Sequence, residues 1–251
     1  MLENVTAMSN QFAVLLAAAG KSHRFADGDN HSDDCNTEDN VGALKKPFVE
    51  LAGQPVWQHS AALFAADPRV CQLIVILSPE DREFFEATHS QQIVQWSLEL
   101  VDGGTERFES VENGLRRVRP DIDFVAIHDA ARPCVRREQI DAVFRVAEQF
   151  DAAILAAPLV GTIKRADAST YDIAETVPRD HLWEAQTPQV FRRELIVNAF
   201  AKRGTTSVTD DAQLVENIGH TVKIVSSDRS NIKITTASDL EFARLLISLR
   251  H

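Results

Sequence analysis

Residues 12–24 read FAVLLAAAGKSHR, so eight consecutive apolar residues run directly into a glycine and then into a basic, polar segment. An apolar run without alternation is typical of a strand that is buried on both faces of a parallel sheet. Small residues where such a strand ends let backbone N–H groups approach a ligand closely, and ligands bind at this carboxyl edge of α/β sheets. The segment therefore predicts a first strand that leads into a ligand-binding turn.

Further short apolar runs alternate with amphipathic segments along the chain. The runs predicted to be strands after the first one (12–19) are residues 73–77, 124–127, 153–157 and 221–225. Helical stripes of apolar residues lie between them, one from Phe108 to Val118 and one from Ile140 to Ala147, and Thr236 with Asp239 predicts a capped helix over 240–249. This alternation predicts a single α/β domain over residues 1–251, with a mostly parallel sheet in three layers.

Composition and charge limit the possible functions. The chain has 251 residues, of which 44% are hydrophobic, and its net charge of −11 argues against nucleic acid and anionic membranes as partners. No run of eighteen apolar residues is present, and the first ten residues lack the basic and apolar regions of a signal peptide. The three cysteines form no C-x-x-C pair, so we expect a reducing, cytoplasmic environment.

An acidic segment at residues 25–44 interrupts the pattern. It carries six carboxylates and no lysine or arginine, so it accounts for more than half of the net charge. Such a composition buries too little apolar surface to offset the entropy of ordering, which predicts a mobile loop insertion. Its His31, Asp33, Asp34 and Cys35 could ligate a metal, but a solvated loop is the stronger interpretation.

The turn after the first strand does not match the common phosphate-binding motifs. Gly20-Lys21-Ser22 resembles the end of a P-loop, but the required glycine five positions earlier is Leu15, and no G-x-G-x-x-G is present. Two other segments are stronger candidates for the site. They are the glycine turn at 103–110 (GGTERFES), which is a natural cradle for an anion or a polar base, and the strand end at 128–133 (HDAARP). The pair of lysines in Lys45-Lys46-Pro47-Phe48 is, on the residues alone, more typical of a solvated face than of a site.

Together these segments resemble the 2-C-methyl-D-erythritol 4-phosphate cytidylyltransferases of the non-mevalonate isoprenoid pathway. The resemblance rests on motifs that span residues 12–245 in order. They are the A-A-G…R turn (18–24), KPF (46–48), DGGTER with Ser110 (102–110), HDAARP (128–133), AP with Thr162 (157–162), TVPR (176–179), Trp183, QTPQ (186–189), TDD (209–211) and NIKIT (231–235). The resemblance implies a Rossmann-like nucleotidyltransferase fold with a protruding dimerisation arm at about 160–186.

The resemblance also implies roles for individual residues. Arg24 and Lys46 would stabilise the α-phosphate in the transition state, and Arg179 and Lys233 would position the acceptor phosphate. Acceptor-binding residues would be Asp129, Arg132, Thr162, Arg179 and Thr187. Nucleotide-binding residues would be Ala17, Ala18, Ala19, Gly20, Gly103, Gly104, Thr105, Arg107, Ser110, Asp129 and Ala130. The expected reaction joins CTP to the acceptor phosphate and releases pyrophosphate, with Mg²⁺ bridged by the triphosphate rather than held mainly by the protein.

Departures from the family pattern leave alternatives open. The family has proline where Ala17 stands, and the spacing from Arg24 to Lys46 is longer than usual, so Lys45 competes with Lys46 for the catalytic role. A ribitol 5-phosphate cytidylyltransferase shares most of the motifs, and an inactive nucleotide-binding regulatory module is a further alternative. The expected assembly is a homodimer in which Thr162 and Arg179 serve the neighbouring site.

Overall fold

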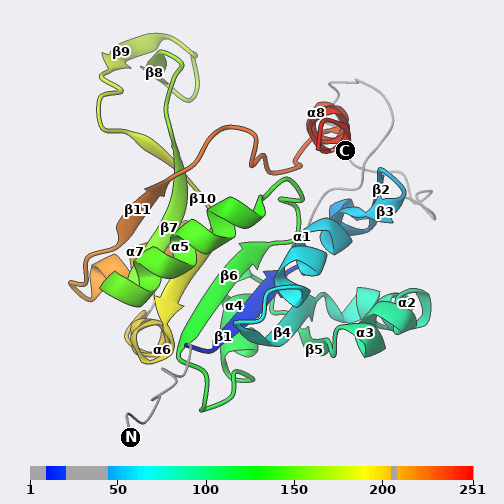
Figure 1. Cartoon of the computed structure of the whole chain (residues 1–251). Coiled ribbons are helices and arrows are strands. Elements are labelled where there is room, and N and C mark those ends of the chain that lie inside the picture. Colours follow the sequence, from blue (N-terminus) through cyan, green and yellow to red (C-terminus); the bar gives the residue numbers. More distant parts are fainter. Residues whose placement is uncertain (1–9, 21–44, 205–207, 251) are drawn as a thin grey trace, which may run out of the picture.

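The protein is described here from a computed structural model that covers residues 10–20, 45–204 and 208–250. Arg24 and the predicted acidic loop at 25–44 lie outside these residues. Along the described chain, strands and helices alternate as predicted (Figure 1). The strands are β1 (Phe12–Ala17), β2 (Glu50–Leu51), β3 (Gln54–Pro55), β4 (Val70–Leu77), β5 (Glu99–Asp102), β6 (Phe124–Asp129), β7 (Ala152–Pro158), β8 (Ile163–Ala166), β9 (Ile173–Val177), β10 (Trp183–Arg192) and β11 (Lys223–Ser226). The helices are the 3₁₀ turn η1 (Lys46–Phe48), α1 (Val56–Ala65), α2 (Pro79–Thr88), α3 (Ser90–Gln95), α4 (Arg107–Leu115), α5 (Arg137–Phe150), α6 (Arg193–Ala201), α7 (Asp211–Asn217) and α8 (Ala237–Ser248).

Seven strands form the central sheet in the order β11-β7-β10-β6-β1-β4-β5. β1 lies between β4 and β6 and is parallel to both, while β10 is antiparallel to its neighbours β6 and β7. The mostly parallel sheet is therefore confirmed. β5 and β10 were not predicted, because β5 (ELVD) has only two apolar residues, flanked by acids, and β10 contains Gln186, Pro188 and other residues untypical of a buried strand.

Helices cover both faces of this sheet, which confirms the three layers. Phe12, Val14 and Leu16 of β1 face a core formed with α1 and α5. Ala13 and Leu15 face the opposite core, which α4, α6 and α7 complete. The alternation follows from the two-residue period of a strand, and it explains why β1 is apolar at every position.

Two smaller units extend from the sheet. α8 packs over β2 through Leu240, Ala243 and Ile247, and the predicted cap is confirmed, since the Thr236 hydroxyl accepts from the Asp239 N–H at 3.2 Å. β8 and β9 pair with each other and protrude from the body between β7 and β10 (Figure 1). Trp183, Glu184 and Ala185 pair with β7, so the last residues of the predicted arm belong to the central sheet.

Within the described residues, no helix is long and apolar enough to cross a membrane.

Candidate active site

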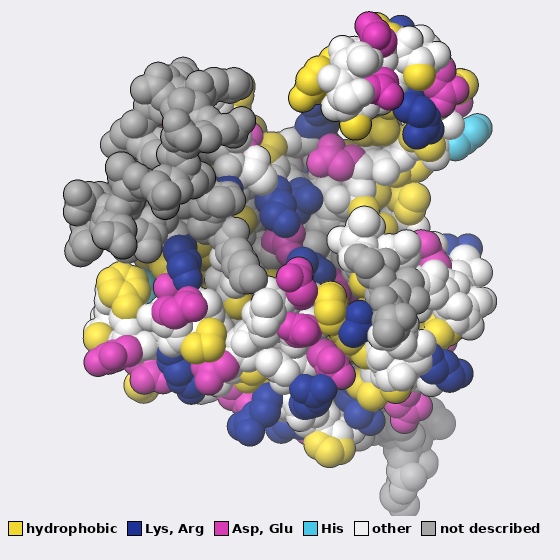
Figure 2. All heavy atoms as spheres, turned by 180° about the vertical axis from the view of Figure 1, so that it is seen from behind, with side chains coloured by type: hydrophobic (Ala, Val, Ile, Leu, Met, Phe, Trp, Pro, Cys, Tyr) yellow, Lys and Arg dark blue, Asp and Glu magenta, His cyan; other side chains and the backbone are white. Residues whose placement is uncertain are grey.

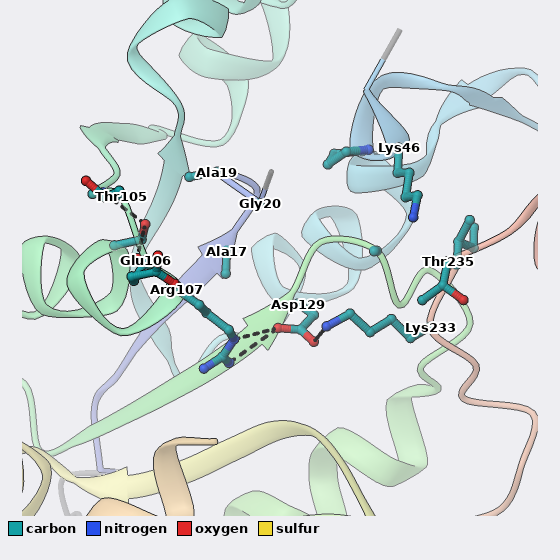
Figure 3. Close-up of a pocket in the computed structure, with 15 residues that line it drawn as sticks. Ala17, Ala19, Gly20, Lys46, Thr105, Glu106, Arg107, Asp129, Lys233 and Thr235 are labelled. Atoms are coloured by element: carbon teal, nitrogen blue, oxygen red, sulfur yellow. Dashed lines mark hydrogen bonds and ion pairs between the residues drawn. The ribbon is translucent and has the colours of Figure 1, made fainter. Parts of the chain in front are cut away.

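A pocket of about 370 Å³ opens at the carboxyl ends of β1 and β6, a volume within the range of small-molecule sites (Figure 3). Its wall combines the turn after β1, the glycine turn before α4, the start of η1 and the segment before α8. It is lined by Ala17, Ala19, Gly20, Lys46, Pro47, Gly104, Thr105, Glu106, Arg107, Ser110, Asp129, Ala131, Lys233, Ile234 and Thr235.

Most of the residues predicted for the nucleotide meet at this pocket. From the predicted set, the lining includes Ala17, Ala19, Gly20, Lys46, Gly104, Thr105, Arg107, Ser110, Asp129 and Lys233. It does not include Ala18, Gly103, Ala130, Arg132, Thr162, Arg179 or Thr187. These segments lie far apart in sequence, and the parallel arrangement of β1, β4 and β6 brings them to one edge.

Gly103 joins two walls of the pocket. A Cβ at this position would lie 2.5 Å from the Ala19 Cβ and 2.8 Å from the Ser110 Oγ, closer than side chains approach one another. The Gly103 N–H donates to the Leu77 carbonyl at 2.7 Å, which fixes the turn against the end of β4. Glycine therefore allows the turn after β5 to pack directly on the turn after β1.

The glycine turn before α4 satisfies its own backbone donors. The Thr105 and Glu106 N–H groups donate to the Glu109 carboxylate at 2.7 and 3.0 Å, and the Gly104 N–H donates to the Ser110 hydroxyl at 3.0 Å. Three donors that the sequence suggested for an anion are thus already bonded within the turn. The turn presents a rigid surface rather than a set of free N–H groups.

Asp129 sits at the centre of the charges in the pocket (Figure 3). Arg107 Nε and Nη2 each lie 3.3 Å from Asp129 Oδ1, and Lys233 Nζ lies 2.7 Å from Oδ2. Burial alone would raise the pKa of Asp129, but Arg107, Lys233 and Arg132 together lower it well below its usual range. The carboxylate therefore stays ionised at neutral pH and holds two cations at the pocket.

His128, next to Asp129, is fully buried and engaged at both ring nitrogens. Its Nδ1 lies 3.1 Å from the Thr187 Oγ1, which also accepts from the Asp129 N–H at 3.1 Å. Since that hydroxyl then donates to Nδ1, Nε2 carries the proton and donates to the Arg132 carbonyl at 3.2 Å. Burial lowers the pKa of His128 to about 4, so the ring is neutral and orients the strand end.

The two consecutive lysines have different surroundings. Lys45 Nζ lies 2.7 Å from Asp81 Oδ2 and 2.8 Å from the Ser78 hydroxyl at the start of α2. Lys46 lines the pocket instead. The geometry favours Lys46 over Lys45 as the residue that can contact a bound ligand.

The remaining predicted acceptor residues lie elsewhere. Thr162 and Arg179 belong to the protruding segment, where Arg179 Nη1 donates to the Val160 carbonyl. Arg132 is buried and donates to the Asn231 carbonyl at 2.7 Å, and the Thr187 hydroxyl is occupied by His128 and Asp129. Their roles toward an acceptor stay predictions.

Sequence reasoning missed Asp211, a buried acid that lies 2.9 Å from Arg107 Nη2. The TDD motif at 209–211 was a signal, but it suggested no role. Five further lining residues were missed too, although each lies within a motif that the sequence analysis quoted: Pro47, Glu106, Ala131, Ile234 and Thr235.

Basic side chains gather in a hollow below the protruding segment, with acidic side chains beside them (Figure 2). A three-layer α/β fold with a cationic pocket at its strand ends is typical of enzymes that act on phosphorylated ligands. Comparisons with known proteins identify the family to which the chain belongs. The family model of 2-C-methyl-D-erythritol 4-phosphate cytidylyltransferase matches residues 12–248. The chain belongs to this family.

Individual relatives agree over nearly the whole chain. A 2-C-methyl-D-erythritol 4-phosphate cytidylyltransferase of Solibacter usitatus is 37% identical over 239 residues, which cover 94% of this chain and 95% of the relative. The enzyme of that name from Geobacillus kaustophilus is 39% identical over 209 residues, covering 82% and 90%. The crystal structure of the Francisella tularensis enzyme of that name superposes with a TM-score of 0.73 at 28% identity, and the match covers 95% of this chain and 100% of that one.

The chain is accordingly a cytidylyltransferase of the non-mevalonate isoprenoid pathway. It joins CTP and 2-C-methyl-D-erythritol 4-phosphate to give 4-diphosphocytidyl-2-C-methyl-D-erythritol and pyrophosphate. Family membership decides against the ribitol 5-phosphate acceptor and against an inactive regulatory module.

Proposed function

We propose that the pocket at the ends of β1 and β6 is where CTP binds and reacts, with Lys46, Arg107 and Lys233 as its described cations. The observation that carries the proposal is the convergence of these three side chains on one pocket from separate elements. Arg24, which lies outside the described residues, is assigned with Lys46 to the α-phosphate. Ala17, Ala19, Gly20, Gly104, Thr105 and Ser110 form the walls against the nucleotide.

The chemistry requires neutralisation of charge rather than a general base. The acceptor is a phosphate monoester with a second pKa of about 6, so at neutral pH it is largely a dianion that can attack the α-phosphorus of CTP directly. The neutral His128 supports this proposal, because both of its ring nitrogens are engaged in hydrogen bonds and neither is available for proton transfer. Catalysis then depends on holding two polyanions in line and stabilising the charge that develops.

Magnesium is proposed to enter with the triphosphate. Among the described residues, no group of three or more histidines, cysteines and carboxylates could hold a metal ion. Asp129, one of the two acids that line the pocket, has one oxygen on Arg107 and the other on Lys233. Phosphate oxygens and water would therefore supply most of the ligands, and the metal would neutralise charge on the departing pyrophosphate.

A homodimer with shared sites is proposed from the protruding segment. Its Val160, Tyr171 and Ile173 side chains are more than half exposed, although they are apolar. Contact with a second subunit would bury these exposed apolar side chains. In the proposed dimer, Thr162 and Arg179 of one subunit would reach the acceptor phosphate in the other, together with Asp129, Arg132 and Thr187 of that site.

One experiment tests the reaction and its assignment to this site. Pyrophosphate release is measured with 2-C-methyl-D-erythritol 4-phosphate and with ribitol 5-phosphate, each with CTP, UTP and GTP. Turnover only with CTP and the first acceptor is expected. Equal turnover with ribitol 5-phosphate would contradict the acceptor, and full activity of a Lys46→Ala variant would contradict the site.

Complementation tests the shared site. Inactive Lys46→Ala and Arg179→Ala subunits are mixed, and heterodimers are verified by mass spectrometry. One of the two sites in each heterodimer would then carry neither substitution, so activity should return. Verified heterodimers without activity would refute sharing across the interface.

A cytoplasmic location is also proposed, on the composition of the chain and because Cys71 and Cys134 are free thiols. Cell fractionation tests it directly.

A further inference from the structure

Asp211 is a buried acid beside the pocket that has no role in the reaction described above. The residue is 1% exposed and does not line the pocket. Its Oδ2 accepts a hydrogen bond from Arg107 Nη2 at 2.9 Å, across 104 residues of sequence. Asp211 is the first residue of α7, so the contact joins α7 to the start of α4.

Arg107 is shared between this acid and Asp129. The same Nη2 that contacts Asp211 lies 3.3 Å from Asp129 Oδ1, and Nε lies at the same distance. Asp129 in turn holds Lys233 at 2.7 Å through its other oxygen. The four side chains form a row of alternating charges that ends at the pocket, and the two acids fix the plane of the guanidinium between them.

Asp210, the residue before Asp211, makes the contacts that stabilise the start of α7. The Asp210 carboxylate caps the helix by accepting the Gln213 N–H at 3.1 Å, and it also accepts from Gln189 Nε2 at 2.9 Å. Asp211 makes neither contact. Its contact with Arg107 is therefore separable from the folding of the helix.

The fold keeps the Asp211 carboxylate at a cost in stability. Burial raises the pKa of Asp211 above its usual value, even though Arg107 opposes this shift. An acid whose pKa is raised on folding makes the folded state less stable above that pKa, because the unfolded chain then ionises more easily. A neutral amide of the same shape would avoid this cost. Retention of a costly charge beside a pocket points to function.

We propose that Asp211 is a positioning residue for the nucleotide, which acts through Arg107 by fixing the guanidinium against Asp129. The inference rests on the proposed binding of CTP at this pocket. With Asp211 neutral, Arg107 has one charged partner instead of two, and its guanidinium turns toward Asp129 alone. The surface that it presents to the nucleotide then changes, while the acceptor side of the site is left as it was.

Asp211→Asn tests the inference, with Asp210→Ala as the matched control one residue away. Asp211→Asn should raise the KM for CTP, and the Kd for CTP in isothermal titration calorimetry, about tenfold. The KM for the acceptor should change less than about twofold, and the Tm should stay the same or rise. Asp210→Ala should instead lower the Tm by about 2–4 °C and leave the KM for CTP unchanged. An unchanged Kd for CTP in Asp211→Asn would overturn the inference.

A double-mutant cycle shows whether Asp211 acts through Arg107. Arg107→Gln should itself weaken CTP binding, and adding Asp211→Asn should weaken it less than about twofold further. If the two effects multiply instead, Asp211 acts independently and the inference fails. If Arg107→Gln binds CTP as the parent does, the assignment of Arg107 to the nucleotide fails, and the inference fails with it.

Discussion

Replacing the two consecutive lysines one at a time tests whether Lys46, rather than Lys45, has the proposed catalytic role. Lys46 lines the pocket, whereas Lys45 lies 2.7 Å from Asp81 at the start of α2. We expect Lys46→Ala to lower kcat strongly and to change the KM for CTP little, because the charge that Lys46 is proposed to neutralise develops on the α-phosphate in the transition state.

The size of the effect follows from electrostatics. Two unit charges about 4 Å apart, in surroundings with an effective dielectric constant of about 20, attract by about 4 kcal/mol. Loss of an interaction of this kind corresponds to a reduction in kcat of about two to three orders of magnitude. Lys45→Ala removes a partly exposed ion pair, so it should lower the Tm by no more than about 2–4 °C and kcat less than about tenfold.

The assay is pyrophosphate release under steady-state conditions, with CTP and the acceptor varied separately, and the Tm of each variant is measured to confirm that it is folded. A Lys46→Ala variant whose loss appears only in the KM for CTP would remove Lys46 from the transition state. A larger loss of kcat in Lys45→Ala than in Lys46→Ala would show that the assignment is wrong by one residue.

Three further predictions follow from the same structure. Gly103→Ala should destabilise the protein by about 1–3 kcal/mol in urea unfolding and raise the KM for CTP, because the added Cβ would meet Ala19 and Ser110. Gly161→Ala, whose Cβ would have no atom within 4 Å, is the control, and equal stabilities of the two variants would contradict the close packing at Gly103. Because the pKa of His128 is lowered from 6.5 to about 4, the unfolded chain binds a proton more readily than the folded chain between these pH values, and the unfolding free energy should fall by about 3 kcal/mol from pH 7 to pH 4. His128→Gln should lose that part of the pH dependence, and an unfolding free energy that falls with pH as steeply as in the parent would refute the prediction. Thr187→Val should cost about 1–3 kcal/mol of unfolding free energy, since the Asp129 N–H and His128 Nδ1 lose their shared partner, and a neutral result in the same assay would count against the network.

The fold could be predicted where apolar runs are long and uninterrupted. β1, β4, β6 and β7 were expected from such runs and β11 from a shorter one that Lys223 interrupts, and each lies in the central sheet. β10 was not, because Gln186, Thr187 and Gln189 are polar. The structure shows why a buried strand tolerates them: Gln186 and Thr187 bond to Asn231 and His128, and Gln189 bonds to Asp210. A local sequence pattern does not reveal hydrogen-bond partners that lie this far away in the sequence.

The candidate site, like the fold, could be predicted only in part. Position at a strand end indicated Asp129, because parallel strands bring their carboxyl ends to one edge, whereas Lys46, Arg107 and Lys233 were predicted from the family resemblance; all four line the pocket. Asp211 belongs to a motif that was noticed, but its partner Arg107 lies on another helix. The choice between Lys45 and Lys46 also needed the structure, since only the position of α2 gives Lys45 a partner.

The anchoring of Lys45 has a consequence for how the chain can vary in length. Twenty-five residues separate Gly20 from Lys46, and the contact of Lys45 with Ser78 and Asp81 comes immediately before η1. Closing a longer loop costs little, about 0.6 kcal/mol for each doubling of its length. Because the anchor lies between that segment and Lys46, we expect that residues inserted or lost between Arg24 and Lys45 leave the Lys46 ammonium in place. A fixed point of this kind lets evolution remodel the sequence beside a pocket while the chemistry inside it stays the same.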